Sequence, residues 1–197
     1  MLSPLGRLFA YSASLLTIKK HIMKSALLVI LATASMVVAC AQEKKPEDKT
    51  KRPSPPAQTK ATLASGAALT IDYSQPSLKG RTIGKDVEPM NGKVWRTGAN
   101  EATTFEVTKD VKVEGKTLTA GKYALFTIAN DDQWTIIFNK TADQWGAEDY
   151  KEADDVLRVN VKPGKATQPV EKFTIKADKS GLVTILWGDR KVDFKVE

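Results

Sequence analysis

The side chains best suited to chemistry gather in one stretch, residues 93–101, which reads KVWRTGANE. It supplies an indole, a guanidinium, an amide and a carboxylate, from Trp95, Arg96, Asn100 and Glu101. A guanidinium can bind a carboxylate or phosphate through two parallel hydrogen bonds, and an indole can pack against a sugar or another planar ligand. We therefore expect a ligand site here. The alternative is a structural role, in which Arg96 forms an internal ion pair with Glu101.

Two more candidate binding residues, Asn139 and Trp145, lie further along the chain. Trp145 belongs to segment 141–155, TADQWGAEDYKEADD, which interrupts the regular pattern of the later sequence and could hold one helical turn. Connections of this length often carry function or cover a sheet edge. Trp134 and Trp187 fall instead within strand-like runs, so we expect both in the core.

Several catalytic classes are excluded by residue type. The chain has one histidine, His21, and one cysteine, Cys40, and both precede residue 62. The later sequence therefore lacks the base or thiolate that Ser-His-Asp catalysis, Cys-His catalysis and histidine or cysteine zinc sites require. A carboxylate-pair hydrolase remains an alternative, with its acids drawn from Glu101, Asp143, Glu148 and Asp149. The acids follow no EF-hand spacing, so we expect no metal ion, and we expect no cofactor.

The N-terminal region has the features of an export signal. From Met23 the sequence reads MKSALLVILATASMVVAC, with one lysine, an apolar run shorter than a bilayer span and a small residue before Cys40. Its end resembles a bacterial lipobox, in which the cysteine becomes the N-terminal residue and receives acyl chains. We predict that Met23 is the working start and that residues 1–39 are a signal peptide. Lipidated Cys40 would then anchor the protein in the bacterial cell envelope, at the outer membrane.

Residues 40–61 are predicted to be the lipidated cysteine followed by a disordered tether. Positions 41–61 have four prolines and no aromatic or branched aliphatic residue, so they can bury little apolar surface. The charge excess of the chain, 30 Lys and Arg against 23 Asp and Glu, lies in the leader and this tether, because residues 62–197 hold 20 of each. Nucleic-acid binding depends on a basic face that neutralises phosphates, so we expect no nucleic-acid partner.

Residues 62–197 are long enough for one domain with a sizeable core. Short runs rich in β-branched and aromatic residues recur at 68–74, 103–108, 111–114, 122–129, 133–139, 156–161, 170–176, 182–187 and 191–196. Their spacing predicts an all-β domain, an antiparallel β-sandwich of jelly-roll or immunoglobulin-like type, with a small barrel as the alternative. Gly188-Asp189 is expected to form a two-residue hairpin turn between the last two runs. Residues 77–92 mix glycine and proline and are expected to form a loop.

Several strings carry a resemblance to a known family. They are YSQPSLKGR at 73–81, GKVWRTGANEAT at 92–103, AGKYALFTI at 120–128, WTIIFNK at 134–140 and QWG at 144–146. Together they resemble the domain of unknown function 2911 family, over about residues 70–197. The resemblance implies an exported, lipid-anchored bacterial protein of a kind typical of the Bacteroidetes, and it implies no particular activity.

These observations favour a lipid-anchored, non-enzymatic module that binds a ligand or partner through residues 93–101, Asn139 and segment 141–155. Its partners would be the membrane, through the lipid, and a glycan, a small molecule or an envelope protein. One alternative is the carboxylate-dependent hydrolase, acting on glycans or other envelope polymers. The other is a structural envelope subunit in which the long loop covers or completes a sheet edge.

Overall fold

The computed structural model describes residues 47–197, so the predicted signal peptide and Cys40 lie outside the described residues. Its strands are β1 (Pro56–Thr62), β2 (Ala68–Ser74), β3 (Val94–Trp95), β4 (Thr103–Val107), β5 (Val111–Val113), β6 (Lys116–Leu118), β7 (Gly121–Ala129), β8 (Trp134–Asn139), β9 (Asp155–Val161), β10 (Gly164–Ala177) and β11 (Leu182–Lys195). Two 3-10 turns, η1 (Lys49–Lys51) and η2 (Glu152–Asp154), complete the elements. Within this part of the chain, no helix has the length and apolar character needed to cross a membrane.

The first layer is a seven-stranded antiparallel sheet. Its order is β1-β2-β4-β7-β8-β9, and β3 also pairs with β7. Trp95 of β3 pairs with Thr127, and Thr103 of β4 pairs with Leu125 on the same edge of β7. The backbone N–H of Thr103 donates to the carbonyl of Arg96 at 3.1 Å. Residues 97–102 are therefore a loop that leaves and rejoins one line of strand, and Arg96 stands at its base.

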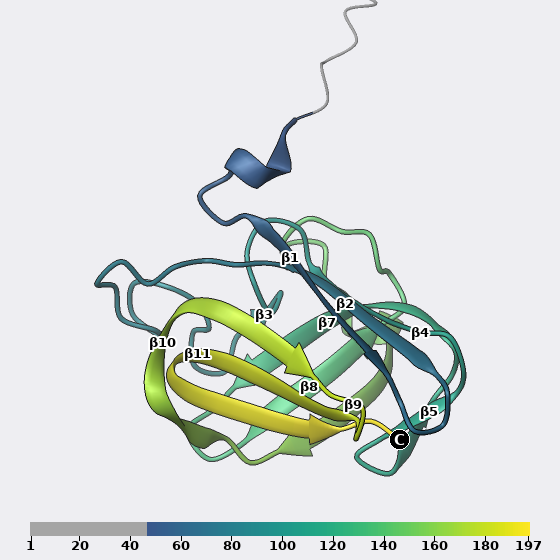
Figure 1. Ribbon diagram of the computed structural model, residues 1–197. Helices are drawn as coiled ribbons and strands as arrows, with labels where there is room; N and C mark the ends of the chain where they lie inside the picture. The colour runs from purple at the N-terminus through teal and green to yellow at the C-terminus, as the bar shows by residue number, and fades with distance from the viewer. Residues whose placement is uncertain (1–46) are drawn as a thin grey trace, which may run out of the picture. The chain divides into compact units, whose positions relative to one another are not determined.

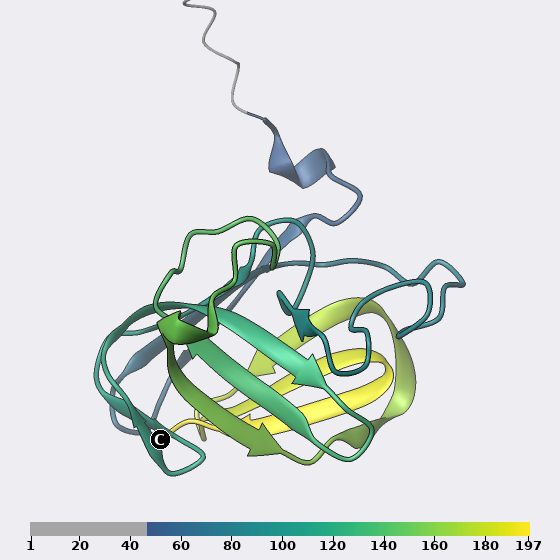
Figure 2. The same cartoon turned by 180° about the vertical axis from the view of Figure 1, so that it is seen from behind.

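The second layer is the long β10-β11 ribbon, which lies over one face of the sheet in Figure 1. A bridge between Val113 and Val196 joins β5 to the end of β11, and a bridge between Ser77 and Lys172 adds the chain after β2 to β10. Figure 2 shows the opposite side, with β7, β8 and β9 in front. The irregular segments 75–93 and 140–154 form separate arches in that view.

Aromatic side chains fill the space between the two layers. Phe105 and Phe138 of the sheet meet edge to face, with ring centroids 4.9 Å apart. Phe173 of β10 packs in the same way against Trp95 at 5.1 Å and against Trp187 at 6.0 Å. Such pairs contribute about 0.5–1.5 kcal/mol each beyond the burial of their area. Trp134 and Trp187 are buried in this core, as the sequence predicted, whereas Trp95 was expected at a ligand site.

The predicted all-β antiparallel architecture is confirmed, and its sandwich-like pair of layers does not close, so the small-barrel alternative is wrong. The predicted hairpin turn at Gly188-Asp189 is also wrong, because β11 runs unbroken through both residues. Gly188 pairs with Val170 at a point where the register of the ribbon shifts on both sides. An irregularity of this kind bends a strand without ending it. Gly188 has a φ of +61°, which side chains rarely adopt, and a Cβ there would lie 2.7 Å from the end of the Ile83 side chain, so glycine is favoured.

The predicted tether extends too far into the domain. Residues 56–61 belong to β1, which pairs with β2 in unbroken register from Pro56–Ser74 to Thr62–Ala68. The hydroxyl of Thr59 also donates to the carbonyl of Ile175 at 2.7 Å, linking β1 to the second layer. An edge strand takes its hydrogen bonds from a neighbour and tolerates proline at its first position, so composition did not reveal it. Residues Asp48–Glu197 form one compact unit with its own core, as expected of a domain that folds independently.

Candidate functional site

Trp95 is a core residue that holds the loop at 97–102 in place. It is 1% exposed, and its indole N–H donates to the carbonyl of Gly98 at 3.0 Å. Its ring meets Trp134 and Phe173 edge to face. Because the indole is buried against these two rings, a planar ligand cannot stack on its face. Trp95 therefore positions the loop and does not bind a ligand itself.

The rest of the loop is fixed by short hydrogen bonds. The hydroxyl of Thr103 donates to the carbonyl of Thr97 at 2.6 Å. The amide of Asn100 donates to the carbonyl of Ser54 at 2.9 Å and to the hydroxyl of Ser74 at 3.2 Å. A Cβ at Gly98 would lie 3.1 Å from the carbonyl oxygen of Ser74, so the close approach favours glycine. The loop is therefore a rigid support for Arg96.

Arg96 has a half-buried side chain that makes no hydrogen bond or ion pair with any described residue, and its Nε is buried. The predicted internal pair with Glu101 is wrong, because Glu101 pairs with Arg52 and Lys49. Buried polar groups are nearly always hydrogen-bonded, and an unsatisfied one costs roughly 1–3 kcal/mol. A buried, unpartnered guanidinium nitrogen on a rigid loop is thus the least satisfied cationic group of this stretch.

Beside Arg96 lies a cavity of about 450 Å³, within the range of ligand pockets. Segment 75–93 supplies much of its wall, including Arg81, Asp86 and Glu88, and the amide-bearing Asn100 completes it. The guanidinium of Arg81 is held by the carbonyls of Ser77 and Leu78, at 2.6 and 3.0 Å. The carboxylates accept backbone N–H groups, Asp86 from Thr82 at 2.9 Å and Glu88 from Met90 at 2.7 Å. These contacts fix the charged groups before any ligand arrives.

Glu101 and Trp145 lie at a different place, so the predicted residues do not share one cleft. They bridge each other as strand partners and line a shallow cavity of about 250 Å³. Trp145 is 55% exposed, and the guanidinium of Arg52 lies 5.8 Å from its ring centroid. Arg52 and Lys49, both in the predicted tether, reach the Glu101 carboxylate at 2.9 and 2.8 Å.

This environment decides what Glu101 can do. Burial alone would raise its pKa, but hydrogen bonds from Lys49, from its own backbone and from Arg52 outweigh burial and lower the pKa to about 2. A glycosidase general acid needs a raised pKa to stay protonated at neutral pH. Glu101 is held ionised and cannot fill that role.

Asn139 is a structural residue that closes both ends of segment 141–155. It is 1% exposed, and its amide donates to the carbonyl of Lys151 at 3.1 Å and to Asp155 at 2.8 Å. Its side-chain oxygen accepts the backbone N–H of Thr141 at 3.0 Å. With these bonds made, little of the amide is left for a ligand.

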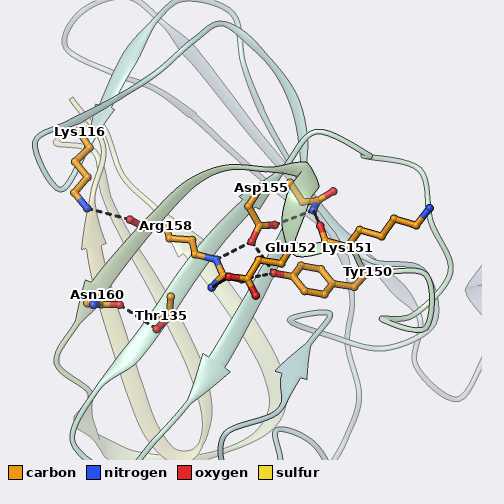
Figure 3. A network of polar contacts seen from close by, with 9 residues as sticks. Lys116, Thr135, Tyr150, Lys151, Glu152, Asp155, Arg158 and Asn160 are labelled. Carbon is orange, nitrogen blue, oxygen red and sulfur yellow. Dashed lines mark hydrogen bonds and ion pairs between the residues drawn. The ribbon is translucent and has the colours of Figure 1, made fainter.

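Residues at the end of segment 141–155 belong to a polar network centred on Arg158 (Figure 3). Arg158 donates to Asp155 at 2.7 Å and to the hydroxyl of Tyr150 at 2.5 Å, and pairs with Glu152 at 3.0 Å. The Tyr150 hydroxyl donates to Asp155 at 2.6 Å, and burial together with that carboxylate raises the pKa of Tyr150 to about 12. Every group in the network has a partner, so it locks the segment and offers no free group to a ligand. The helical turn was predicted near Ala147 to Ala153, and the structure has a 3-10 turn at its end instead, η2 at Glu152–Asp154.

Three residues of the cavity beside Arg96 escaped the sequence analysis: Arg81, Asp86 and Glu88. The only signal for them was the length and irregularity of segment 77–92, since loops of that size often carry function. Among the described residues, no group of three or more acids, histidines or cysteines is placed to hold a metal ion.

The fold and the cavity define the class: an antiparallel β-sandwich with a preformed, arginine-containing pocket beside the loop at 97–102. The chain belongs to the family described as Protein of unknown function (DUF2911), whose model matches residues 54–196. The match begins just before β1, in agreement with the strand's place in the domain. No curated protein and no solved structure matches the chain.

Proposed function

We propose that this protein is a lipid-anchored, non-enzymatic binding module of the bacterial cell envelope, and that the cavity beside Arg96 takes a small hydroxylated carboxylate, a sugar acid. The observation that carries this proposal is the state of Arg96, whose Nε is buried without a partner at the wall of a cavity of about 450 Å³. A bound carboxylate would give the Arg96 guanidinium, which lines the cavity, the charged partner that no described residue supplies.

The other charged groups narrow the ligand class. The cavity is lined by two cations, Arg81 and Arg96, and by two carboxylates, Asp86 and Glu88. Their charges cancel, so the lining has no net charge. Two carboxylates would repel a dianion such as a phosphate monoester, yet they are good acceptors for hydroxyl groups. A sugar acid has one carboxylate for the guanidinium and several hydroxyls for the acids, which suits this lining.

The envelope address rests on the leader. A single lysine, an apolar run and Cys40 follow one another as they do in an acylated exported protein. Growth with an alkyne-tagged fatty acid should label the chain and leave the Cys40→Ser variant unlabelled. A chain without label, found in the cytosol, would contradict the anchoring.

The binding proposal is tested by isothermal titration of residues 41–197 with galacturonate and glucuronate, and with galactose as the uncharged control. At least one uronate should bind and galactose should bind more weakly. Arg96→Gln should weaken uronate binding by roughly tenfold to a hundredfold, because one charge-assisted pair contributes about 1.5–3 kcal/mol. Arg52→Gln is the matched control, since Arg52 does not line this cavity, and it should leave the affinity unchanged. Binding of neither uronate, or an unchanged affinity in Arg96→Gln, would overturn the proposal.

A further inference from the structure

A second cavity, of about 700 Å³, is also lined by residues of segment 75–93. It is bounded by that segment, by the turn after β7 and by the irregular part of the β10-β11 ribbon. Three cations line it, Arg81, Lys165 and Arg190, together with the indole of Trp134. Arg81 also lines the cavity beside Arg96, so the two cavities meet at one residue.

Two of these cations lie in an unfavourable position relative to each other. Lys165 and Arg190 are direct cross-strand partners in the antiparallel ribbon. Like charges in that position have Cβ atoms about 5 Å apart and destabilise the pair. Neither has an ion pair with any residue in the described range, although Lys191 next in the chain pairs with Asp193 at 2.7 Å. An anion between Lys165 and Arg190 would remove the repulsion.

The indole of Trp134 adds an unused donor to the same wall. Trp134 is 2% exposed as a residue, but its N–H has no acceptor in the described part of the chain and is not among the buried unpartnered atoms, so it reaches the solvent of this cavity. The other two core indoles both donate to backbone carbonyls, Trp95 to Gly98 at 3.0 Å and Trp187 to Glu88 at 2.8 Å. The N–H of Trp134 is therefore a donor open to the cavity, and a ligand oxygen there could replace the water that accepts from it.

The remaining lining decides between classes of anion. Two carboxylates, Asp131 and Asp189, join the three cations, and four apolar residues complete the wall: Leu78, Ile83, Pro163 and Pro169. Closely spaced phosphates would meet repulsion from the acids. A sugar chain offers hydroxyls to the acids, C–H faces to the apolar residues and well-separated carboxylates to the cations.

We propose that the two cavities are subsites of one groove that binds an acidic oligosaccharide, with one carboxylate at Arg96 and another between Lys165 and Arg190. Arg81, fixed by two backbone carbonyls, lies at the junction of the subsites. The inference rests on the proposed function for the first subsite and extends it from a single sugar acid to a polymer segment. A second subsite raises affinity because its binding step becomes intramolecular.

The test compares galacturonic acid with its oligomers of two to six residues, titrated into residues 41–197. In the wild-type chain the affinity should rise by on the order of a hundredfold between the monomer and the length that spans both subsites. Arg190→Gln should abolish most of this rise and leave the affinity of the monomer for the Arg96 subsite unchanged. Arg96→Gln should weaken the monomer and the oligomers alike. Lys191→Gln, whose lysine pairs with Asp193 and lines neither cavity, is the matched control and should behave as wild type.

Each outcome separates the two proposals. An affinity that does not rise with length, or a rise that survives in Arg190→Gln, overturns the groove while the Arg96 subsite stands. Oligomer binding that depends on Arg190 without any monomer binding at Arg96 overturns the proposed function and its extension together. An acidic peptide of Glu and Ser that competes more strongly than every oligomer overturns the assignment to a sugar chain.

Discussion

Replacing Arg96 by methionine should leave the empty protein as stable as the wild type, or make it slightly more stable. Methionine keeps most of the apolar stem, removes the charge and removes the buried Nε that has no partner. An unsatisfied buried group costs roughly 1–3 kcal/mol, and some packing is lost in exchange, so the free energy of unfolding should change by less than about 1 kcal/mol or rise. A buried arginine with an internal acidic partner would instead lose about 3–5 kcal/mol.

The assay is urea unfolding of residues 41–197 at neutral pH, with the slope of the transition checked for constancy. Arg52→Met is the matched control, because its guanidinium makes two bonds to Glu101, at 3.0 and 2.9 Å. It should lose about 1 kcal/mol, as the carboxylate is partly exposed to solvent. Galacturonate at a hundred times its Kd should add about 2.7 kcal/mol to the wild type and nothing to Arg96→Met. A loss of more than about 3 kcal/mol in Arg96→Met without ligand would refute the argument, since it would reveal an internal partner.

Three further predictions concern the frame around the site. Asn139→Ala should lower the free energy of unfolding by roughly 2–4 kcal/mol and speed hydrogen exchange across segment 141–155, since it removes three buried hydrogen bonds; unchanged exchange there would contradict the role. The pKa of Glu101 lies at about 2 instead of 4.5, so its contribution to stability is present above about pH 4.5 and is lost as the pH falls towards 2. Glu101→Gln should remove this pH dependence of the urea midpoint, an effect of less than about 1 kcal/mol because the carboxylate is partly exposed to solvent. A variant with the same pH profile as the wild type would contradict the prediction. A chain beginning at residue 62 should melt well below residues 47–197, because it lacks β1 and exposes the edge of β2, whereas equal melting temperatures would show that β1 is dispensable.

The sandwich architecture was predictable because strand burial has a period of two, and that alternation is local in the sequence. The two errors of the fold arose where local signals are ambiguous. Gly188-Asp189 has the composition of a hairpin turn, but in the structure the strand continues through both residues, and the register of the ribbon is irregular there. β1 has the composition of a linker, yet its backbone is held by β2 through hydrogen bonds that any side chains would permit.

The stretch that contains Arg96 was correctly singled out, but its contacts were not predictable. Side-chain partners depend on which distant segments the register brings together, and Glu101 received its cations from Arg52 and Lys49, more than forty residues earlier. That long-range pairing left Arg96 free. The groups across the cavity, on segment 75–93, lie in irregular sequence that carries no periodic signal of where its side chains point.

The most direct test of a carboxylate site at Arg96 is the side-chain Nε–H resonance of that arginine in a nitrogen–proton correlation spectrum. On titration with galacturonate, the account predicts that this resonance shifts and saturates with the Kd measured by calorimetry. An Arg96 resonance that remains unmoved while galacturonate saturates the protein would contradict the account.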